Sequence, residues 1–193
     1  MKTLELCYAE LNNPIFYKKV VKKRIAKIVL GASVIRAFKH GTKPNLLNCL
    51  INLDINSLLN IESEADYDKW HTKKITSVYN CLFRNTKNSY KGYYSGLKWG
   101  HATKVFNLFI GHLFYYSPYF NKKNTIKANR YFHVPLDSKV FSLLKELKII
   151  VPKSIKTLNV TTYRRIQNAL RVAAQRQGVE PLRFDDYAWV HID

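Results

Sequence analysis

Two charged residues have the types and the settings that a chemical reaction could use. Lys104 stands where the stretch from Gly96 to Tyr116 becomes apolar, and Asp137 is the only acid in the first half of the stretch from Asn129 to Leu147. A lysine at the rim of a core is partly removed from water, which makes its amine a better nucleophile. A carboxylate can accept a proton or stabilise a cation that develops beside it. We therefore expect the two residues to form one site.

Each of the two residues also has a simpler interpretation. Lys104 fits a solvent-exposed position on a helix, and Asp137 fits a helix N-cap, whose replacement by Ala typically costs about 1 kcal/mol. For Asp137 the two roles are compatible, because the backbone N–H groups that a cap binds also hold its carboxylate in a fixed direction. The capping role therefore does not argue against a catalytic one.

The composition points to a polyanionic partner. The chain has 193 residues, with 32 Lys and Arg against 13 Asp and Glu, which gives a formal charge of +19. This charge is larger than solubility requires and favours nucleic acid as the partner, with an anionic membrane surface as the rival. We expect no obligate protein partner.

The cysteines and the apolar runs exclude several classes of protein. Cys7, Cys49 and Cys81 are widely spaced and form no CxxC pair, so we expect no disulfide framework, no metal and no cofactor. No signal peptide is recognisable, and no run of ~18 uncharged apolar residues could span a membrane. These features predict a cytoplasmic protein.

The spacing of apolar residues predicts an all-α fold. We expect one compact domain over residues 1–193, in which 1–88 supply N-terminal helices and 89–193 carry the lysine and the aspartate. The residues after Gly178 read as a short aromatic tail. The expected helices are a basic amphipathic helix over 15–39, a helix over 46–53, one of roughly five turns after Ser63, an apolar buried helix over 100–116, one starting at Asp137, and one from Thr161 or Thr162 to Gln177.

The surroundings of the lysine and the aspartate resemble a known family. The segment W-G-H-A-T-K ends at Lys104, and 33 positions later (137 minus 104) H-V-P-L-D-S-K-V contains Asp137. This pattern resembles the helix-hairpin-helix superfamily of DNA glycosylases, and it is most similar to the archaeal 8-oxoguanine glycosylase branch. By this resemblance Lys104 aligns with the lysine that attacks the sugar C1′, and Asp137 with the aspartate that assists departure of the base. We count Ser138 and Lys139, which follow the aspartate, among the DNA-binding residues.

The hairpin of the family is altered here. Its usual sequence is L-P-G-[VI]-G, whereas S-G-L-K-W-G supplies Gly96 and Gly100 with three residues between them and no proline. The resemblance therefore implies a helix-hairpin-helix glycosylase-like helical domain with a degenerate hairpin. We assign Gly96, Lys98 and Gly100 to DNA binding, because Gly100 could begin a helix whose free N-terminal amides suit a phosphate.

An enzyme of this kind must flip its target base out of the duplex into an aromatic or apolar pocket. The expected pocket residues surround the two motifs, and each has core or loop packing as its alternative: Tyr93, Tyr94, Trp99, His101 and His133.

A basic surface for duplex DNA is expected from two helices. The last long helix places Arg164, Asn168, Arg171 and Gln175 along one side. The other basic residues expected on this surface are Arg165, Lys153, Lys156 and a lysine cluster on the first helix at 18, 19, 22 and 23. Either group could instead be an ordinary solvated face.

These observations favour a DNA glycosylase that excises a damaged or modified base, with Lys104 and Asp137 as its catalytic residues. A nucleophilic Lys104 would form a Schiff base and nick the strand, as an AP lyase does, whereas an activated water would only hydrolyse the bond. The resemblance implies 8-oxoguanine as substrate, or a hypermodified phage base, since some small glycosylases defend bacteria against such phages. Two alternatives remain open: a non-catalytic DNA-binding protein on the same scaffold, and a basic protein bound to an anionic membrane or to RNA.

Overall fold

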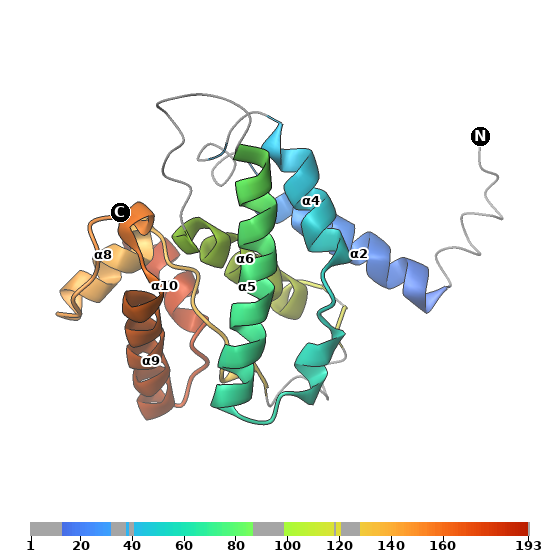
Figure 1. Cartoon of the computed structure of the whole chain (residues 1–193). Coiled ribbons are helices and arrows are strands. Elements are labelled where there is room, and N and C mark those ends of the chain that lie inside the picture. The colour runs from blue at the N-terminus through green and yellow to red at the C-terminus, as the bar shows by residue number, and fades with distance from the viewer. Residues whose placement is uncertain are drawn as a thin grey trace.

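The computed structural model describes residues 13–31, 38, 41–86, 99–117, 119–120 and 128–192, although not the side chains of 83–86, and this part of the chain is all-helical (Figure 1). The expected all-α fold is therefore confirmed there. In chain order the elements are α2 (Pro14–Val29), α4 (Thr42–Asn52), the 3₁₀ helix η1 (Asn56–Asn60), α5 (Glu64–Thr86), α6 (Trp99–Tyr115), α8 (Ser138–Glu146), the 3₁₀ helix η2 (Ile155–Thr157), α9 (Val160–Gln177) and α10 (Arg183–His191).

The buried side chains form two hydrophobic clusters. The first joins α2, α4, α5 and α6, and the second joins α8, α9 and α10. Helix α6 is buried along almost its whole length and packs against α2, α5 and η2. In Figure 1, α5 crosses in front of α6 while α8, α9 and α10 gather at one side. Lys104 on α6 therefore stands where the two clusters meet.

The first helix differs from its expected form. It ends at Val29, and residues 32–37 and 39 of the expected helix lie outside the described residues. Its buried face consists of Val21, Lys22, Ile25, Ala26 and Val29, whereas Tyr17, Val20 and Ile28 are exposed. The assignment of Lys22 to a solvated basic cluster was wrong, because its ammonium donates to the Leu53 carbonyl and burial lowers its pKa to about 8.

Several expected helix ends are confirmed. The Ser63 hydroxyl accepts from the Asp66 N–H at 3.1 Å at the start of α5, and the Asp137 carboxylate caps α8. Helix α9 ends at Gln177 as expected, and its C-cap Gly178 has a φ of 65°, a left-handed conformation that favours glycine. Its start differs from the expected Thr161 or Thr162, because Asn159 is the N-cap and the helix begins at Val160.

Helix α10 was missed in the sequence, where its residues read as an aromatic tail. Its start carries the usual signals: Pro181 precedes the helix, and Asp185 and Asp186 lie in its first turn, where negative charge is favourable. This helix supplies one wall of the candidate site.

Gly100 lets α6 approach η2 closely. A Cβ built at this residue would lie 2.4 Å from the Ile155 carbonyl oxygen, which is backbone and cannot move aside. The expectation that Gly100 offers a free helix start to a phosphate is therefore wrong, because the residue is buried beneath η2.

We predict that Gly100→Ala destabilises the protein by about 1–3 kcal/mol, as overpacking a tight contact does. Thermal unfolding should show a midpoint lowered by several degrees, at roughly 2–4 °C per kcal/mol for a chain of this size. Gly111→Ala is the matched control on the same helix, since its Cβ would meet Leu182 at an ordinary 3.6 Å and alanine favours a helix by up to about 1 kcal/mol. Equal midpoints for the two variants would contradict the close contact.

Candidate active site

Lys104 and Asp137 form an ion pair. The Nζ atom of Lys104 lies 3.3 Å from Oδ2 of Asp137, and their side chains are 24% and 8% exposed. The proximity expected from the sequence is therefore confirmed, while a catalytic role for the pair stays a prediction. The pair keeps limited access to solvent through the lysine, so a ligand could reach it.

The two oxygens of Asp137 have separate tasks. Oδ1 accepts from the backbone N–H groups of Lys139 at 3.0 Å and Val140 at 3.1 Å, which is the N-cap of α8. Oδ2 faces Lys104. Because Oδ1 is fixed by the backbone, the cap determines where Oδ2 points, as the compatibility of the two roles requires.

Two side chains form hydrogen bonds with the backbone of the extended segment before Asp137. The Val134 N–H donates to Oε1 of Gln167 at 2.8 Å, and the Val134 carbonyl accepts from Nε2 of the same side chain at 2.8 Å. Nδ2 of Asn107 donates to the same carbonyl at 3.2 Å. Since Asn107 lies one turn after Lys104 on α6, this bond ties the aspartate's segment to the lysine's helix.

A buried polar network supports Asn107. Its Oδ1 lies 2.7 Å from Nε2 of His71, and its Nδ2 donates to the Tyr163 hydroxyl at 2.8 Å. That hydroxyl lies 2.8 Å from Nδ1 of His133, and burial lowers the pKa of His133 to about 4. Burial also lowers the pKa of His71 and raises that of Tyr163. All three rings are therefore neutral near pH 7.

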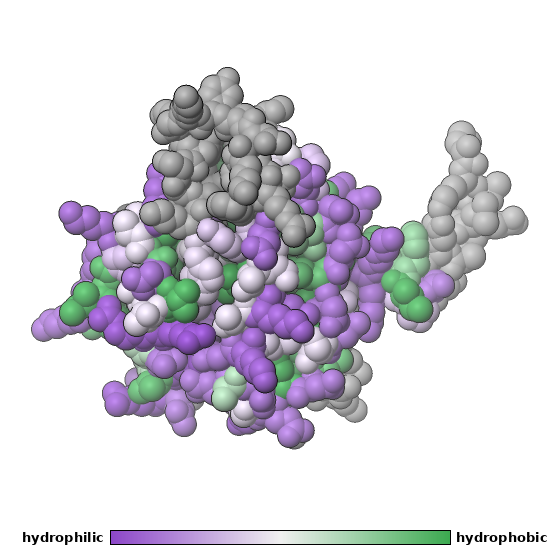
Figure 2. Space-filling model, viewed as in Figure 1, coloured by the Kyte–Doolittle hydropathy of each residue, from purple (hydrophilic) through white to green (hydrophobic). Residues whose placement is uncertain are grey.

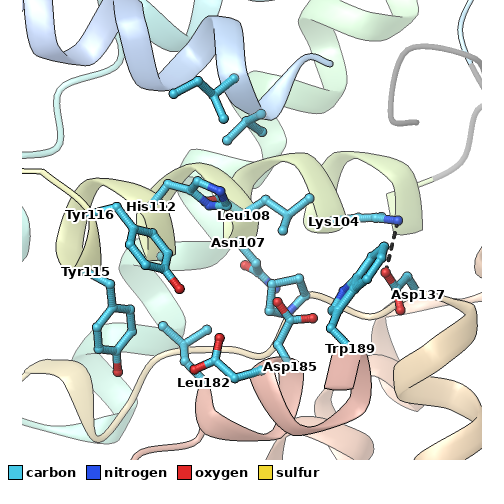
Figure 3. A pocket seen from close by; sticks show the side chains of 15 residues that line it. Lys104, Asn107, Leu108, His112, Tyr115, Tyr116, Asp137, Leu182, Asp185 and Trp189 are labelled. Atoms are coloured by element: carbon cyan, nitrogen blue, oxygen red, sulfur yellow. Dashed lines mark hydrogen bonds and ion pairs between the residues drawn. The ribbon is translucent and has the colours of Figure 1, made fainter. Parts of the chain in front are cut away.

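A first cavity of about 360 Å³ opens on one side of the ion pair, between α2, α6 and α10 (Figure 3). This volume lies within the ~300–1,000 Å³ that is usual for small-molecule pockets. Its walls combine aromatic rings with carboxylates. They are Tyr115, Tyr116 and Trp189 together with Asp137, Asp185 and Asp186, besides His112 and apolar residues such as Leu108 and Leu182.

Asp185 is the unusual group of this cavity. Figure 3 shows its side chain pointing from α10 toward α6, close to Trp189. Its Oδ1 is buried and has no hydrogen-bond partner among the residues that the structure describes. Burial, followed by the charges of Asp137 and Asp186, raises the pKa of Asp185 to about 7, while Lys104 and Trp189 oppose the shift. Near neutral pH this carboxyl is therefore protonated in about half of the molecules.

A second cavity of about 370 Å³ lies on the other side of the ion pair, between α6, α8 and η2. Lys104 and Asp137 are the two residues that line both cavities. Besides Lys104 and Asp137, the described polar residues that line the second cavity carry a hydroxyl group or a basic side chain. They are Ser138, Ser142, Ser154, Lys145, Lys153 and His101.

The expected pocket residues are dispersed. Trp99 packs against both hydrophobic clusters, with its ring 4.9 Å from that of Tyr163, and lines neither cavity. His133 belongs to the buried network, and His101 lines the second cavity beside Phe38. Because His133 is buried among these partners, its assignment to the base pocket was wrong. Trp99 is half-buried, and its contact with a base stays a prediction. Tyr93 and Tyr94 lie outside the described residues.

Some of the expected DNA-binding residues are bound within the protein, and others are exposed. Arg171 is 6% exposed and donates to Asp68 at 2.6 Å and Glu64 at 2.7 Å, so its assignment to a DNA-binding surface was wrong. Lys139 donates to the Ile192 carbonyl and lies over the Trp189 ring, and the exposed Arg165 donates to the Ile150 carbonyl at 2.8 Å. Arg164 and Ser138 are exposed, whereas Gly96 and Lys98 lie outside the described residues.

Sequence reasoning missed Asp185 and Trp189. Their spacing of four residues places both on one face of a helix, which is a recognisable signal once the segment is known to be helical. Because α10 was not predicted, nothing in the sequence connected its two acids and its tryptophan with Lys104.

The described residues offer no group of three or more His, Cys, Asp or Glu side chains that could hold a metal ion. Nor does any described helix combine the length and apolarity that a membrane span needs. Comparison of the chain with protein-family models, curated proteins and solved structures finds no match. Function must therefore be argued from the site.

We predict that Asp185→Asn stabilises the protein increasingly as the pH rises. A carboxyl whose pKa is raised to about 7 holds its proton more tightly in the folded state, so its ionisation costs stability between about pH 4 and pH 7. Asparagine cannot ionise, so its gain in unfolding midpoint should be small at pH 4 and several degrees at pH 8. Glu62→Gln, which removes an exposed acid that does not contribute to the shift of Asp185, is the control. A gain that does not change with pH would contradict the assignment.

Proposed function

We propose that the protein is a DNA glycosylase that excises a damaged or modified base, with Lys104 as nucleophile and Asp137 as the carboxylate that assists it. The observation that carries this proposal is the 3.3 Å contact between the amine and the carboxylate at a point shared by two cavities. An amine and a carboxylate in contact can together attack a sugar carbon and stabilise the charge that develops there.

The reaction follows from the two groups. Lys104 loses a proton, for which Oδ2 of Asp137 is within reach, and its lone pair forms a bond to C1′ of the deoxyribose. Asp137 passes this proton on to water and is again ionised when the glycosidic bond breaks. The electron pair of that bond leaves with the base, and the base takes up a proton from water or from the protonated Asp185 carboxyl. Asp137 stabilises the positive, oxocarbenium-like charge on the sugar as the bond breaks. The attached nitrogen gives up a proton, its lone pair expels O4′ from C1′, and O4′ takes up a proton, which leaves a Schiff base on the open sugar. Loss of a C2′ proton then expels the 3′ phosphate and nicks the strand.

The first cavity suits the flipped base. Its aromatic rings offer stacking surfaces, and the unpartnered Oδ1 of Asp185 offers a hydrogen-bonding group that a base edge could satisfy. In its protonated form this carboxyl can donate to a base nitrogen or oxygen as the base departs. The substrate class is thus a purine or pyrimidine with polar groups on the edge that faces α10, as in 8-oxoguanine or a hypermodified phage base.

The charge of the chain supports a DNA partner. A formal charge of +19 supplies the long-range attraction that brings a polyanion to the surface. Figure 2 shows a face dominated by hydrophilic residues, with only scattered hydrophobic ones. This surface favours a nucleic acid over an apolar partner.

We predict that Asp137→Asn abolishes base release and leaves the fold and duplex affinity nearly unchanged. Asparagine is also a good N-cap, so α8 keeps its start, but the charge that faces the developing cation is lost. Oligonucleotides with oxidised, alkylated and deaminated bases, together with phage DNAs that carry hypermodified bases, would be incubated with each protein. Mass spectrometry would then identify released bases.

Asp66→Asn is the matched control, because Asp66 is an exposed acid in the first turn of α5 and removing it changes the net charge equally. The control should release base at the wild-type rate. A wild-type protein that binds DNA but releases no base from any substrate, or an Asp137→Asn variant with full activity, would favour the non-catalytic DNA-binding protein.

A further inference from the structure

We propose that the second cavity binds a phosphate of the DNA strand next to the flipped nucleotide. This inference rests on the proposed function and adds the path of the strand through the site. Among the described residues, the two cavities share Lys104 and Asp137 alone, and they differ in charge. The first contains Asp185 and Asp186, while the second contains Lys145 and Lys153.

The second cavity has the chemistry of an anion site. Lys145 on α8 and Lys153 before η2 come from different elements, and neither forms an ion pair with an acid in the described ranges. The hydroxyls of Ser138, Ser142 and Ser154 form no hydrogen bond with any residue in that part of the chain. Two unpaired ammonium groups and three unengaged hydroxyl donors suit the oxygens of a phosphate.

Asp137, the one acid among the described residues that line this cavity, does not oppose an anion. Asp137 uses Oδ1 for the N–H groups of Lys139 and Val140 and directs Oδ2 at Lys104. Its charge is thus compensated by a helix start and an ammonium. The lysines at 145 and 153 remain available for a ligand.

The covalent structure of a nucleotide fits this arrangement. The base and the phosphate are attached to different carbons of the sugar, and C1′ lies at the base's attachment point. With the base in the first cavity, C1′ comes to Lys104 and the sugar continues toward the second cavity. The acidic wall of the first cavity repels phosphate, so the reverse orientation is disfavoured.

The test measures the affinity of the full-length protein and its variants for DNA duplexes at several salt concentrations. The duplexes carry a stable abasic-site analogue, so that no base release is needed. Lys145→Ala/Lys153→Ala should lower the magnitude of the slope of log K against log salt by about 1, since each lost phosphate contact contributes about 0.9. The control is Lys69→Ala/Lys73→Ala, which removes the same charge from exposed positions on α5 that line neither cavity. Thermal unfolding would show that both variants are folded.

Neutral methylphosphonate groups, placed one at a time around the abasic site, would locate the contact. One position flanking the site should weaken wild-type and control binding several-fold and leave the Lys145/Lys153 variant unaffected. Equal losses for all three proteins at every position would overturn the phosphate site. Inorganic phosphate, compared with chloride at equal ionic strength, should displace little DNA; strong displacement that needs Lys145 and Lys153 would show a site for free phosphate instead.

The two proposals can fail separately. Base release without the methylphosphonate effect would overturn the phosphate site alone. The methylphosphonate effect without base release would overturn the glycosylase proposal. The second cavity would then remain a phosphate-binding site of a non-catalytic DNA-binding protein.

Discussion

The hydrogen bonds to the backbone of Val134 are the constraint on which the site depends. Gln167 binds both the N–H and the carbonyl of this residue, and Asn107 binds the carbonyl from α6. An extended segment buried among helices has no ladder to satisfy its backbone groups, so these side chains take that part. Because Asp137 follows three residues later, fixing Val134 against α6 fixes the carboxylate beside Lys104.

The buried network extends this constraint across the molecule. His71, Tyr163 and His133 connect Asn107 to Asp68 and Arg171, so α5, α6 and α9 are held together by polar contacts in the interior. Satisfied networks of this kind are rigid, since any displacement leaves a polar atom unpaired. The ion pair thus sits on a stiff support, whereas Asp185 approaches from α10, which packs mainly on α8. The elements that position the ion pair are therefore different from the helix that shapes the first cavity.

Local signals made much of the fold predictable. The caps at Ser63, Asp137 and Gly178 depend on a few neighbouring residues, and the apolar run after Lys104 shows directly that α6 is buried. The proximity of Lys104 and Asp137 was predicted from two short motifs. The burial of Lys22 and Arg171 was not predictable, because Lys22 donates to Leu53 and Arg171 to acids more than 100 residues away. Such partners are set by tertiary packing, and one sequence does not show which distant acid meets which base.

The most direct test of the account is reductive trapping at Lys104. Borohydride added during incubation with a DNA substrate reduces a Schiff base to a stable amine, and peptide mapping then identifies the attached residue. The account predicts a covalent protein–DNA adduct at Lys104 that is absent in Lys104→Gln, together with strand nicking by the untreated wild-type protein. Release of base that leaves an intact strand with an abasic site, and no adduct, would show that water is the nucleophile and would contradict the role given to Lys104.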